Sequence, residues 1–255
     1  MIRTSVAMAT YNGAEYVVEQ LESIRTQSMP VDEVIIHDDR STDDTVAIVE
    51  KYIREHGLER TWKVSQNPKN LGYAANFISA VKETVGEYIF FCDQDDIWYP
   101  DKTRRAVTWL DAQEKTDIPL LYHCAYLIRN EATGASSTFY YKEEEYDFRR
   151  SITENHYSGF AMVVNQTMRQ YMLKGDVSQI DYHDWWAANI VKAFGVAYND
   201  QTVGAIHRAH QENVTRITLM SRMRWVRRML TQESDIKKRM QEFEHIFGEC
   251  LSEKN

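Results

Sequence analysis

The segment that most constrains this chain is residues 88–96, where an apolar run, YIFFC, leads directly into Asp93, Asp95 and Asp96. A short apolar run rich in β-forming residues predicts a strand buried on both faces, so the carboxylates fall at its carboxyl end. Open α/β sheets bind their ligands at that end. Carboxylates this close repel one another unless a cation compensates, and oxygen ligands suit Mg²⁺ or Mn²⁺. The segment predicts a metal site, with an acidic surface turn as the alternative.

Strand and helix patterns alternate along the first half of the chain. We predict strands at residues 5–10, 34–36, 62–65 and 88–92. Asn12 with Glu15, and Ser41 or Thr42, are expected to cap the first two intervening helices, and a third helix is expected over 74–84. Parallel neighbouring strands need crossover helices of this kind. The pattern therefore predicts an α/β fold with a mostly parallel central sheet.

The second half is less regular. A helix is expected over 100–114, strands over 120–128, 159–164 and 203–206, and a helix over 184–194. Residues 130–157 are predicted to form an inserted hairpin or loop over the site. We expect one domain over 1–215, with a nucleotide-sugar-binding half at 1–112 and an acceptor half at 113–215. A helical extension is expected at 216–255.

Composition excludes several classes of protein. A chain of 255 residues with 43% apolar content can bury a real core, and a net charge of −8 disfavours nucleic-acid binding. We find no apolar run long enough to span a bilayer and no signal-peptide pattern, so we expect a cytoplasmic protein, either free or peripheral at the inner face of the cell membrane. The three widely spaced cysteines are expected to be small core residues.

Four polar segments follow the predicted strands of the first half. They are residues 10–12, 37–41, 67–72 and 93–96. The carboxyl ends of parallel strands share one rim, so these segments are expected to form one ligand site. Neither a G-x-G-x-x-G nor a G-x-x-x-x-G-K-[ST] sequence is present to cradle phosphates. A metal would then have to screen any phosphates bound there.

These motifs, in this order, resemble family 2 glycosyltransferases of the GT-A fold. The resemblance rests on Thr-Tyr-Asn at 10–12, Asp-Asp-x-Ser-Thr-Asp at 38–43, Asn-x-Gly-x-x-x-Asn at 70–76 and Asp-x-Asp-Asp at 93–96. It covers residues 4–112 closely and 155–215 more loosely. The resemblance implies an inverting transferase that uses a nucleotide-sugar donor and a divalent metal, Mg²⁺ or Mn²⁺.

The resemblance also implies roles on the donor side. Asp39 would accept a hydrogen bond from a pyrimidine ring, with Asp38 as the less certain member of the pair, and Asp93 would reach the ribose or the water shell of the metal. Asp95 and His210 would hold the metal. The predicted donor-binding residues are Thr10, Tyr11, Asn12, Asp39, Asn70, Asn76, Asp93 and Arg208. The alternatives are a helix cap for residues 38–41, a helix cap for Asp96 and a surface position for His210.

Inverting transfer also needs a base for the acceptor hydroxyl. By the resemblance Asp184 fills this role at the start of a helix, whose N-terminus would lower the carboxylate pKa and keep it ionised. Asp181 or His183 could be the base instead. Trp185 and Trp186 would stack on a sugar, and Gly159 would line the acceptor side. The alternative makes Asp184 a helix cap and both tryptophans core residues.

The combined motifs look most like bacterial rhamnosyltransferases that build cell-wall or capsular polysaccharide. That likeness implies dTDP-L-rhamnose as donor, with UDP-hexoses as the alternative, and a glycan or lipid-linked glycan as acceptor. The rival interpretations are a haloacid-dehalogenase-type phosphatase with Asp93 as nucleophile and a non-catalytic assembly subunit. Residues 219–239 combine an apolar stripe with basic residues. Such a helix could lie on an anionic membrane, pair with a second subunit or pack on the domain.

Overall fold

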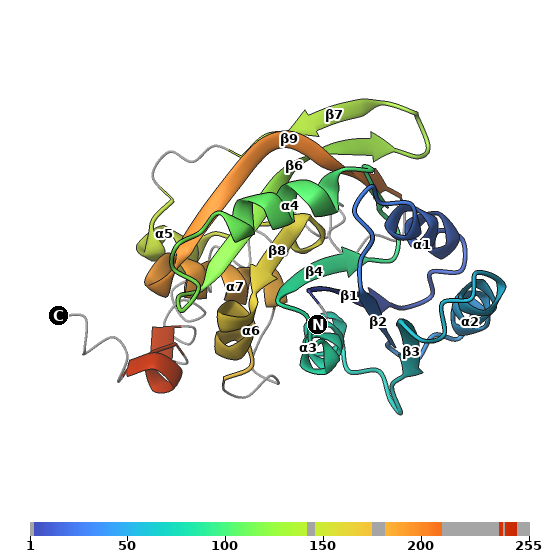
Figure 1. Cartoon of the computed structure of the whole chain (residues 1–255), viewed down its shortest axis with the longest axis horizontal. Coiled ribbons are helices and arrows are strands. Elements are labelled where there is room, and N and C mark those ends of the chain that lie inside the picture. The colour runs from blue at the N-terminus through green and yellow to red at the C-terminus, as the bar shows by residue number, and fades with distance from the viewer. Residues whose placement is uncertain (1–2, 142–145, 175–181, 211–239, 242, 249–255) are drawn as a thin grey trace, which may run out of the picture.

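The computed structural model describes residues 3–141, 146–174, 182–210, 240–241 and 243–248 (Figure 1). Its strands are β1 (Thr4–Thr10), β2 (Glu33–Asp38), β3 (Trp62–Gln66), β4 (Tyr88–Asp93), β5 (Ile97–Trp98), β6 (Leu120–Asn130), β7 (Ser136–Phe139), β8 (Met162–Asn165) and β9 (Val196–Ala209). Its α-helices are α1 (Val17–Arg25), α2 (Thr45–Glu55), α3 (Tyr73–Glu83), α4 (Lys102–Asp111), α5 (Phe148–Thr153), α6 (Gln166–Met172) and α7 (His183–Phe194). A short 3₁₀ turn, η1 (Gly159–Ala161), precedes β8.

One sheet runs through the described residues in the order β3-β2-β1-β4-β8-β6-β9-β5, with β7 paired to β6. Strands β3, β2, β1 and β4 are mutually parallel, β8 runs against its neighbours β4 and β6, and β6 pairs with β9 in parallel. The register sets Thr10 beside Asp38 and Ala9 beside Asp93. The predicted mostly parallel α/β sheet is confirmed, and its polar strand ends do meet at one rim.

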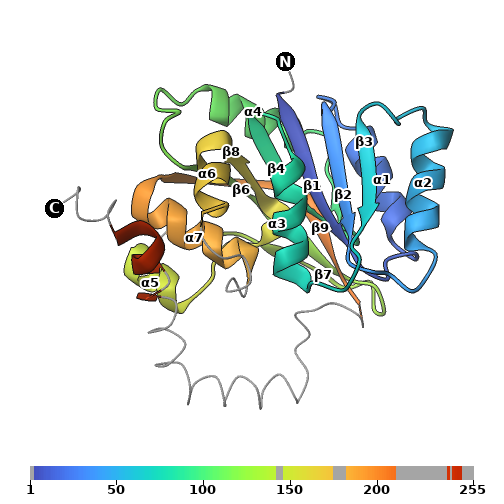
Figure 2. The same ribbon diagram turned by 90° about the horizontal axis from the view of Figure 1, so that it is seen from below.

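Helices cover both faces of the sheet (Figure 2), and the side chains that alternate along the strands pack against these two layers. On one face Val6, Met8 and Phe90 meet apolar residues of α1, α2 and α4. On the other, Ala7 and Phe91 meet residues of α3, α6 and α7. Because β1, β2 and β4 are covered on both faces, they read as continuous apolar runs. The cores of both layers thus hold the strand ends rigidly at the rim.

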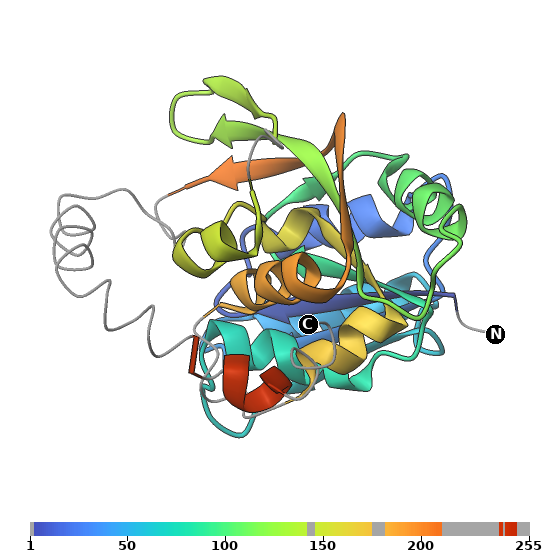
Figure 3. The same cartoon turned by 90° about the vertical axis from the view of Figure 1, so that its left-hand side faces the viewer.

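The second half of the chain extends the same sheet. The insertion predicted at 130–157 is a hairpin only in its first part, where β7 pairs with residues 126–129 of β6 and the two strands project beyond the helices (Figure 3). Strand β9 is much longer than the predicted 203–206, because it pairs with β6 along its whole length across a bulge near Ala125. Strand β5 and helix α6 were not predicted, and neither was helix α5, which lies within the segment expected to be a hairpin or loop. The described parts of the two predicted halves therefore share one continuous sheet.

Two predicted helix caps are wrong. Helix α1 begins at Val17 after Tyr16, and the side-chain Oδ1 of Asn12 accepts instead from the Thr42 backbone N–H. Helix α2 begins at Thr45, and Ser41 bonds Asp38. In both cases the polar side chain that was predicted to cap a helix instead forms a hydrogen bond with a residue outside that helix.

The C-terminal residues 243–248 are helical and lie against α7 (Figure 2). Phe243 and Phe247 are buried there beside Trp186 and Phe194. The predicted basic helix at 219–239 and the boundary at 215 lie outside the described residues. Within the ranges described, no helix has the length and apolarity that a membrane crossing requires.

Candidate functional site

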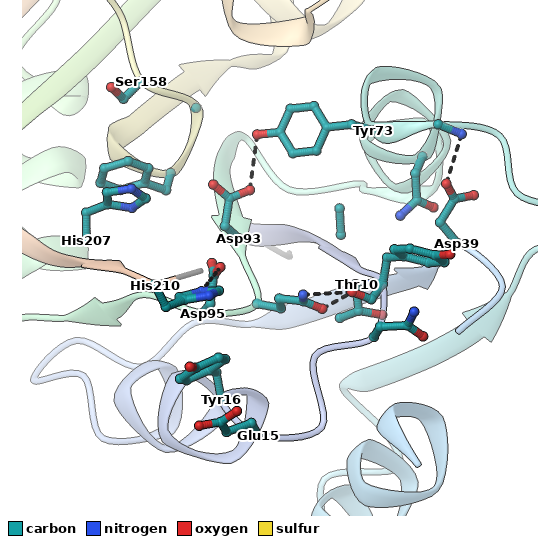
Figure 4. Close-up of a pocket in the computed structure, with 18 of the residues that line it drawn as sticks. Thr10, Glu15, Tyr16, Asp39, Tyr73, Asp93, Asp95, Ser158, His207 and His210 are labelled. Atoms are coloured by element: carbon teal, nitrogen blue, oxygen red, sulfur yellow. Dashed lines mark hydrogen bonds and ion pairs between the residues drawn. The ribbon is translucent and has the colours of Figure 1, made fainter. Parts of the chain in front are cut away.

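A pocket of about 1050 Å³ opens at the carboxyl ends of β1, β2 and β4 (Figure 4). All four predicted polar segments contribute to its walls, and Ser158, Gly159, Tyr182 and Asp184 form its far side. The predicted site residues that line it are Thr10, Tyr11, Asn12, Asp39, Asn70, Asn76, Asp93, Asp95, Gly159, Asp184 and His210. Its volume suits a ligand of nucleotide-sugar size.

The two neighbouring aspartates after β2 have different surroundings. Asp38 is buried and accepts hydrogen bonds from the hydroxyls of Thr10 and Ser41, behind the pocket wall. Asp39 lines the pocket, and its carboxylate accepts from the backbone N–H groups of Leu71 and Gly72, at 2.7 and 2.8 Å (Figure 4). Asp39 is therefore the member of the pair placed to meet a ligand.

The loop after β1 uses its backbone donors internally. The N–H groups of Tyr11, Asn12, Gly13 and Ala14 bond the side chains of Gln94, Ser41, Thr45 and Asp43 respectively. Phosphate-binding loops instead aim such N–H groups at the anion. This loop therefore cannot compensate a diphosphate in its observed form, in agreement with the missing glycine motifs.

The carboxylates at the acidic end of β4 lie close enough to repel one another. Burial, followed by the charges of Asp96 and Asp95, raises the pKa of Asp93 well above its usual value. Asp96 is fully buried, and its Oδ1 pairs with His207 Nδ1 at 2.8 Å. Burial alone would lower the pKa of His207, but the hydrogen bond and charge of Asp96 outweigh it and raise that pKa to about 9. Asp96 is thus a buried ion-pair partner and caps no helix, because the cap position of α4 is Asp101.

Asp95 and His210 lie together, as the resemblance implies. His210 Nε2 is 2.8 Å from Asp95 Oδ2, and the imidazole stacks on Tyr16 with 4.3 Å between ring centroids (Figure 4). Arg208 lies behind them, 3% exposed, and donates to the backbone oxygens of Asp95 and Tyr16 and to the Glu19 carboxylate. The predicted direct phosphate contact of Arg208 does not agree with this position outside the pocket wall. Arg208 instead holds the backbone of Asp95 and lies over the ring of Tyr16, on which His210 stacks.

The pocket is short of positive charge. Its described lining includes Glu15, Asp39, Asp43, Asp93, Asp95 and Asp184 but no lysine or arginine, and its cationic candidates are His207 and His210. The described residues contain no ready cluster of three or more metal-ligating side chains. The paired carboxylate and imidazole of Asp95 and His210, beside the crowded Asp93, nevertheless suit a divalent cation that would relieve this repulsion.

Asp184 lies on the far side of the pocket, at the first turn of α7. Its Oδ1 accepts from the Trp185 N–H at 2.7 Å, and the Asn155 side chain also donates to it. Burial outweighs these bonds and raises the pKa of Asp184 to about 6. The prediction that the helix N-terminus keeps its pKa low is therefore wrong in direction. A carboxylate of raised pKa is better matched to proton abstraction near neutral pH.

The other candidates around Asp184 differ. His183 is fully buried on Phe77 and Phe91 and is absent from the described pocket lining. Burial lowers its pKa to about 3. Asp181 lies outside the described residues. Trp186 is a core residue against Phe243, so its predicted stacking on a sugar is wrong. Trp185 donates its indole N–H to the Ser151 carbonyl and is absent from the described pocket lining.

Sequence reasoning missed three pocket residues with clear partners. Tyr73 donates to Asp93 at 3.2 Å from the first turn of α3, and Tyr16 stacks on His210 (Figure 4). His207 pairs with Asp96. Tyr73 directly follows the Asn-x-Gly segment, which was a usable signal. Nothing in local pattern indicates the partners of Tyr16 or His207, since each contact joins residues far apart in the sequence.

The chain is similar in sequence to known proteins. The family described as Glycosyl transferase family 2 matches residues 5–175 of the chain. The dTDP-rhamnosyl transferase RfbG of Shigella flexneri is 28% identical over 236 residues, covering 81% of this chain and 72% of that protein. The poly(ribitol-phosphate) beta-N-acetylglucosaminyltransferase TarS of Staphylococcus aureus is 36% identical over 124 residues, covering 48% of this chain and 21% of TarS.

Solved structures agree on the fold. The structure of TarS residues 1–349 with UDP-GlcNAc has a TM-score of 0.64 at 21% identity, covering 91% of this chain and 66% of that one. The mannosyltransferase PcManGT of Pyrobaculum calidifontis, with GDP-Man and Mn²⁺, has a TM-score of 0.63 at 20% identity, covering 83% of this chain and 58% of that one. These similarities confirm the predicted GT-A fold.

Proposed function

The chain belongs to glycosyl transferase family 2, and we propose that it is a metal-dependent inverting glycosyltransferase of bacterial surface polysaccharide synthesis. It takes a sugar from a nucleoside diphosphate donor and transfers it to a glycan or lipid-linked glycan acceptor. One observation carries the proposal: Asp39, Asp93, Asp95, His210 and Asp184 line a single pocket at the carboxyl rim of the sheet. The pocket thus brings together a carboxylate for the nucleotide base, Asp39, two residues that would hold a cation, Asp95 and His210, and a base for the acceptor hydroxyl, Asp184.

On the donor side, Asp39 binds the base of the nucleotide. Its carboxylate is already oriented by the N–H groups of Leu71 and Gly72, so accepting one further hydrogen bond needs no rearrangement. Asn70 and Asn76 flank it in the pocket wall. A carboxylate accepts a hydrogen bond from a ring N–H, and among the pyrimidines uracil and thymine carry one whereas cytosine does not.

Asp95 and His210 would hold the divalent cation, Mg²⁺ or Mn²⁺. When bound, such a cation neutralises the donor diphosphate and stabilises the charge that grows on the leaving group. Arg208 fixes the backbone of Asp95 from behind, and Tyr16 supports the His210 ring. Tyr73 steadies the Asp93 carboxylate, which faces the ribose side.

Asp184 removes the proton of the acceptor hydroxyl. It lies in the pocket wall with Ser158 and Gly159, on the far side from the loop after β1. The hydroxyl then attacks the anomeric carbon from the face opposite the departing diphosphate, which inverts the configuration there. Its raised pKa, about 6, lets it accept this proton while ionised at neutral pH.

We propose L-rhamnose from dTDP-L-rhamnose as the transferred group. The support is the 28% identity to the dTDP-rhamnosyl transferase RfbG over most of both chains. A UDP-hexose is the second candidate, since TarS is named as an N-acetylglucosaminyltransferase and was solved with UDP-GlcNAc. Membrane or second-subunit contact through residues 219–239 remains a proposal from their basic, apolar pattern.

The rival activities have less support. In a dehalogenase-type phosphatase the Asp-x-Asp motif opens the fold, whereas here it follows the fourth strand of a family 2 chain. A non-catalytic subunit would have no need for Asp184 and Asp95 in one pocket. Covalent labelling of Asp93 by a phosphoryl mimic would favour the phosphatase instead.

A thermal-shift panel of nucleotide sugars, each with and without Mn²⁺, tests the proposal. Ligands that bind only the folded state raise its melting temperature. We expect dTDP-L-rhamnose to stabilise the protein in a Mn²⁺-dependent way and UDP-GlcNAc and GDP-mannose to do so weakly. Stabilisation by UDP sugars alone would overturn the choice of sugar. Stabilisation by no nucleotide sugar would overturn the transferase.

A further inference from the structure

Gln94, the residue between Asp93 and Asp95, reaches across the pocket floor to the end of β1. Its side-chain oxygen accepts from the Tyr11 backbone N–H at 2.8 Å, and its side-chain nitrogen donates to the Tyr11 carbonyl at 2.9 Å (Figure 4). Both polar groups of the amide are thus used on one residue. A carboxylate or a hydroxyl at this position could not make the same pair of bonds.

Gly13 leaves the space that this amide occupies. A Cβ added at Gly13 would lie 2.1 Å from the Gln94 Oε1 atom and 2.3 Å from its Cδ. The N–H of Gly13 is held by the Thr45 hydroxyl, so the backbone is fixed while the Gln94 side chain is the part that can move. A side chain at 13 would therefore displace Gln94 before it moved the loop.

The side-chain amide of Gln94 connects two parts of the pocket to which we assign different roles. On one side are Asp93 and Asp95, at the end of β4. On the other is Tyr11, whose side chain is 48% exposed in the pocket wall and offers an aromatic face to a nucleotide. These two hydrogen bonds link Tyr11 directly to the segment 93–96.

We propose that Gln94 is a positioning residue that continues the contact between β1 and β4 beyond their last strand pair, Ala9 with Asp93, and holds Tyr11 beside the metal-binding carboxylates, so that base and diphosphate are bound as one unit. The inference rests on the proposed function, because it assumes a nucleoside diphosphate in this pocket. Gln94 itself need touch neither the base nor the phosphates. Loss of the clamp lowers affinity for the whole ligand without unfolding the protein, since water can replace both bonds at this partly exposed position.

The test compares Gln94→Met, Gly13→Ala and the double variant in the full chain. Gln94→Met keeps the side-chain length but removes both bonds, and Gly13→Ala displaces an unaltered Gln94. Gln113→Met is the matched control, because the Gln113 side chain donates to the Trp109 carbonyl of α4 and is absent from the described pocket lining. Calorimetry measures the binding of dTDP and UDP in Mn²⁺, and thermal melting checks the fold.

We expect each single variant to bind the preferred nucleoside diphosphate about tenfold more weakly, with the control unchanged. Because both changes break the same clamp, the double variant should bind no more weakly than the weaker single variant. Wild-type affinity in Gln94→Met, or losses that multiply in the double variant, would overturn the clamp. Failure of the wild-type protein to bind any nucleoside diphosphate would instead overturn the proposed function.

Discussion

The carboxyl group of Asp184 links burial to a measurable pH dependence. Burial raises its pKa to about 6, and a base acts only in its ionised form. Activity should therefore be full above that pH and fall as pH decreases through it. The measurement is kcat/KM against pH, which reports the free enzyme. An acid limb near pH 4 would mean that another group, or an unperturbed carboxylate, is the base.

Replacing Asp184 with asparagine separates its catalytic role from binding. The amide keeps the shape and the bond from the Trp185 N–H but cannot take a proton. We expect transfer to fall by roughly 10²–10⁴-fold, as for loss of a general base, while donor affinity stays near wild type. Parallel assays of transfer and of donor binding check this. Loss of donor binding would place Asp184 in the nucleotide site.

Lys102 is a buried cation behind the pocket. Its side chain is 0% exposed, donates to the Phe160 carbonyl and lies over the Trp98 ring at 3.8 Å. Lys102→Met leaves that carbonyl without its buried donor, so we expect the free energy of unfolding to fall by about 2 kcal/mol. Urea denaturation measures it, with exposed Lys82→Met as the control. Equal, small effects in both would show that the buried amine contributes little.

At the scale of elements, the C-terminal helix is fixed by two aromatic residues. Phe243 is 2% exposed and stacks on Phe194 of α7, whereas Met240 is 51% exposed. Phe243→Ala should lower the free energy of unfolding by about 3 kcal/mol, the usual cost of such a cavity, and Met240→Ala should change it little. Chemical denaturation of both variants is the check. Similar values would show that residues 243–248 do not pack stably on α7.

The elements that sequence predicts well are those whose own residues dictate them. Strands β1, β2 and β4 are apolar because both faces are covered, and α3 and α7 carry clear helical periodicity. The predicted start of α1 was wrong because the Asn12 side chain bonds Thr42, 30 residues away, and does not cap the helix. The length of β9 depends on its pairing with β6, and β5 exists only through its pairing with β9. Pairing across the sheet is not visible in a local window.

Over the whole molecule, parallel strand direction explains why the site could be predicted at all. Residues from four separate segments meet because their strands end at one rim, whatever the order of strands. The charge state of the site could not be predicted in this way. The raised pKa of Asp184, the protonation of His207 and the core position of Trp186 follow from burial and partners supplied by distant elements.

We infer from the acidic pocket that a divalent cation joins the donor diphosphate to this protein. No lysine or arginine lines the described part of the pocket, and the loop after β1 spends its N–H groups internally. The most direct measurement is calorimetric titration of dTDP and UDP into wild-type protein and Asp95→Ala, each with Mn²⁺ or with EDTA. We predict tight binding only for wild-type protein with Mn²⁺. Equal affinity in EDTA, or in Asp95→Ala with Mn²⁺, would contradict the account.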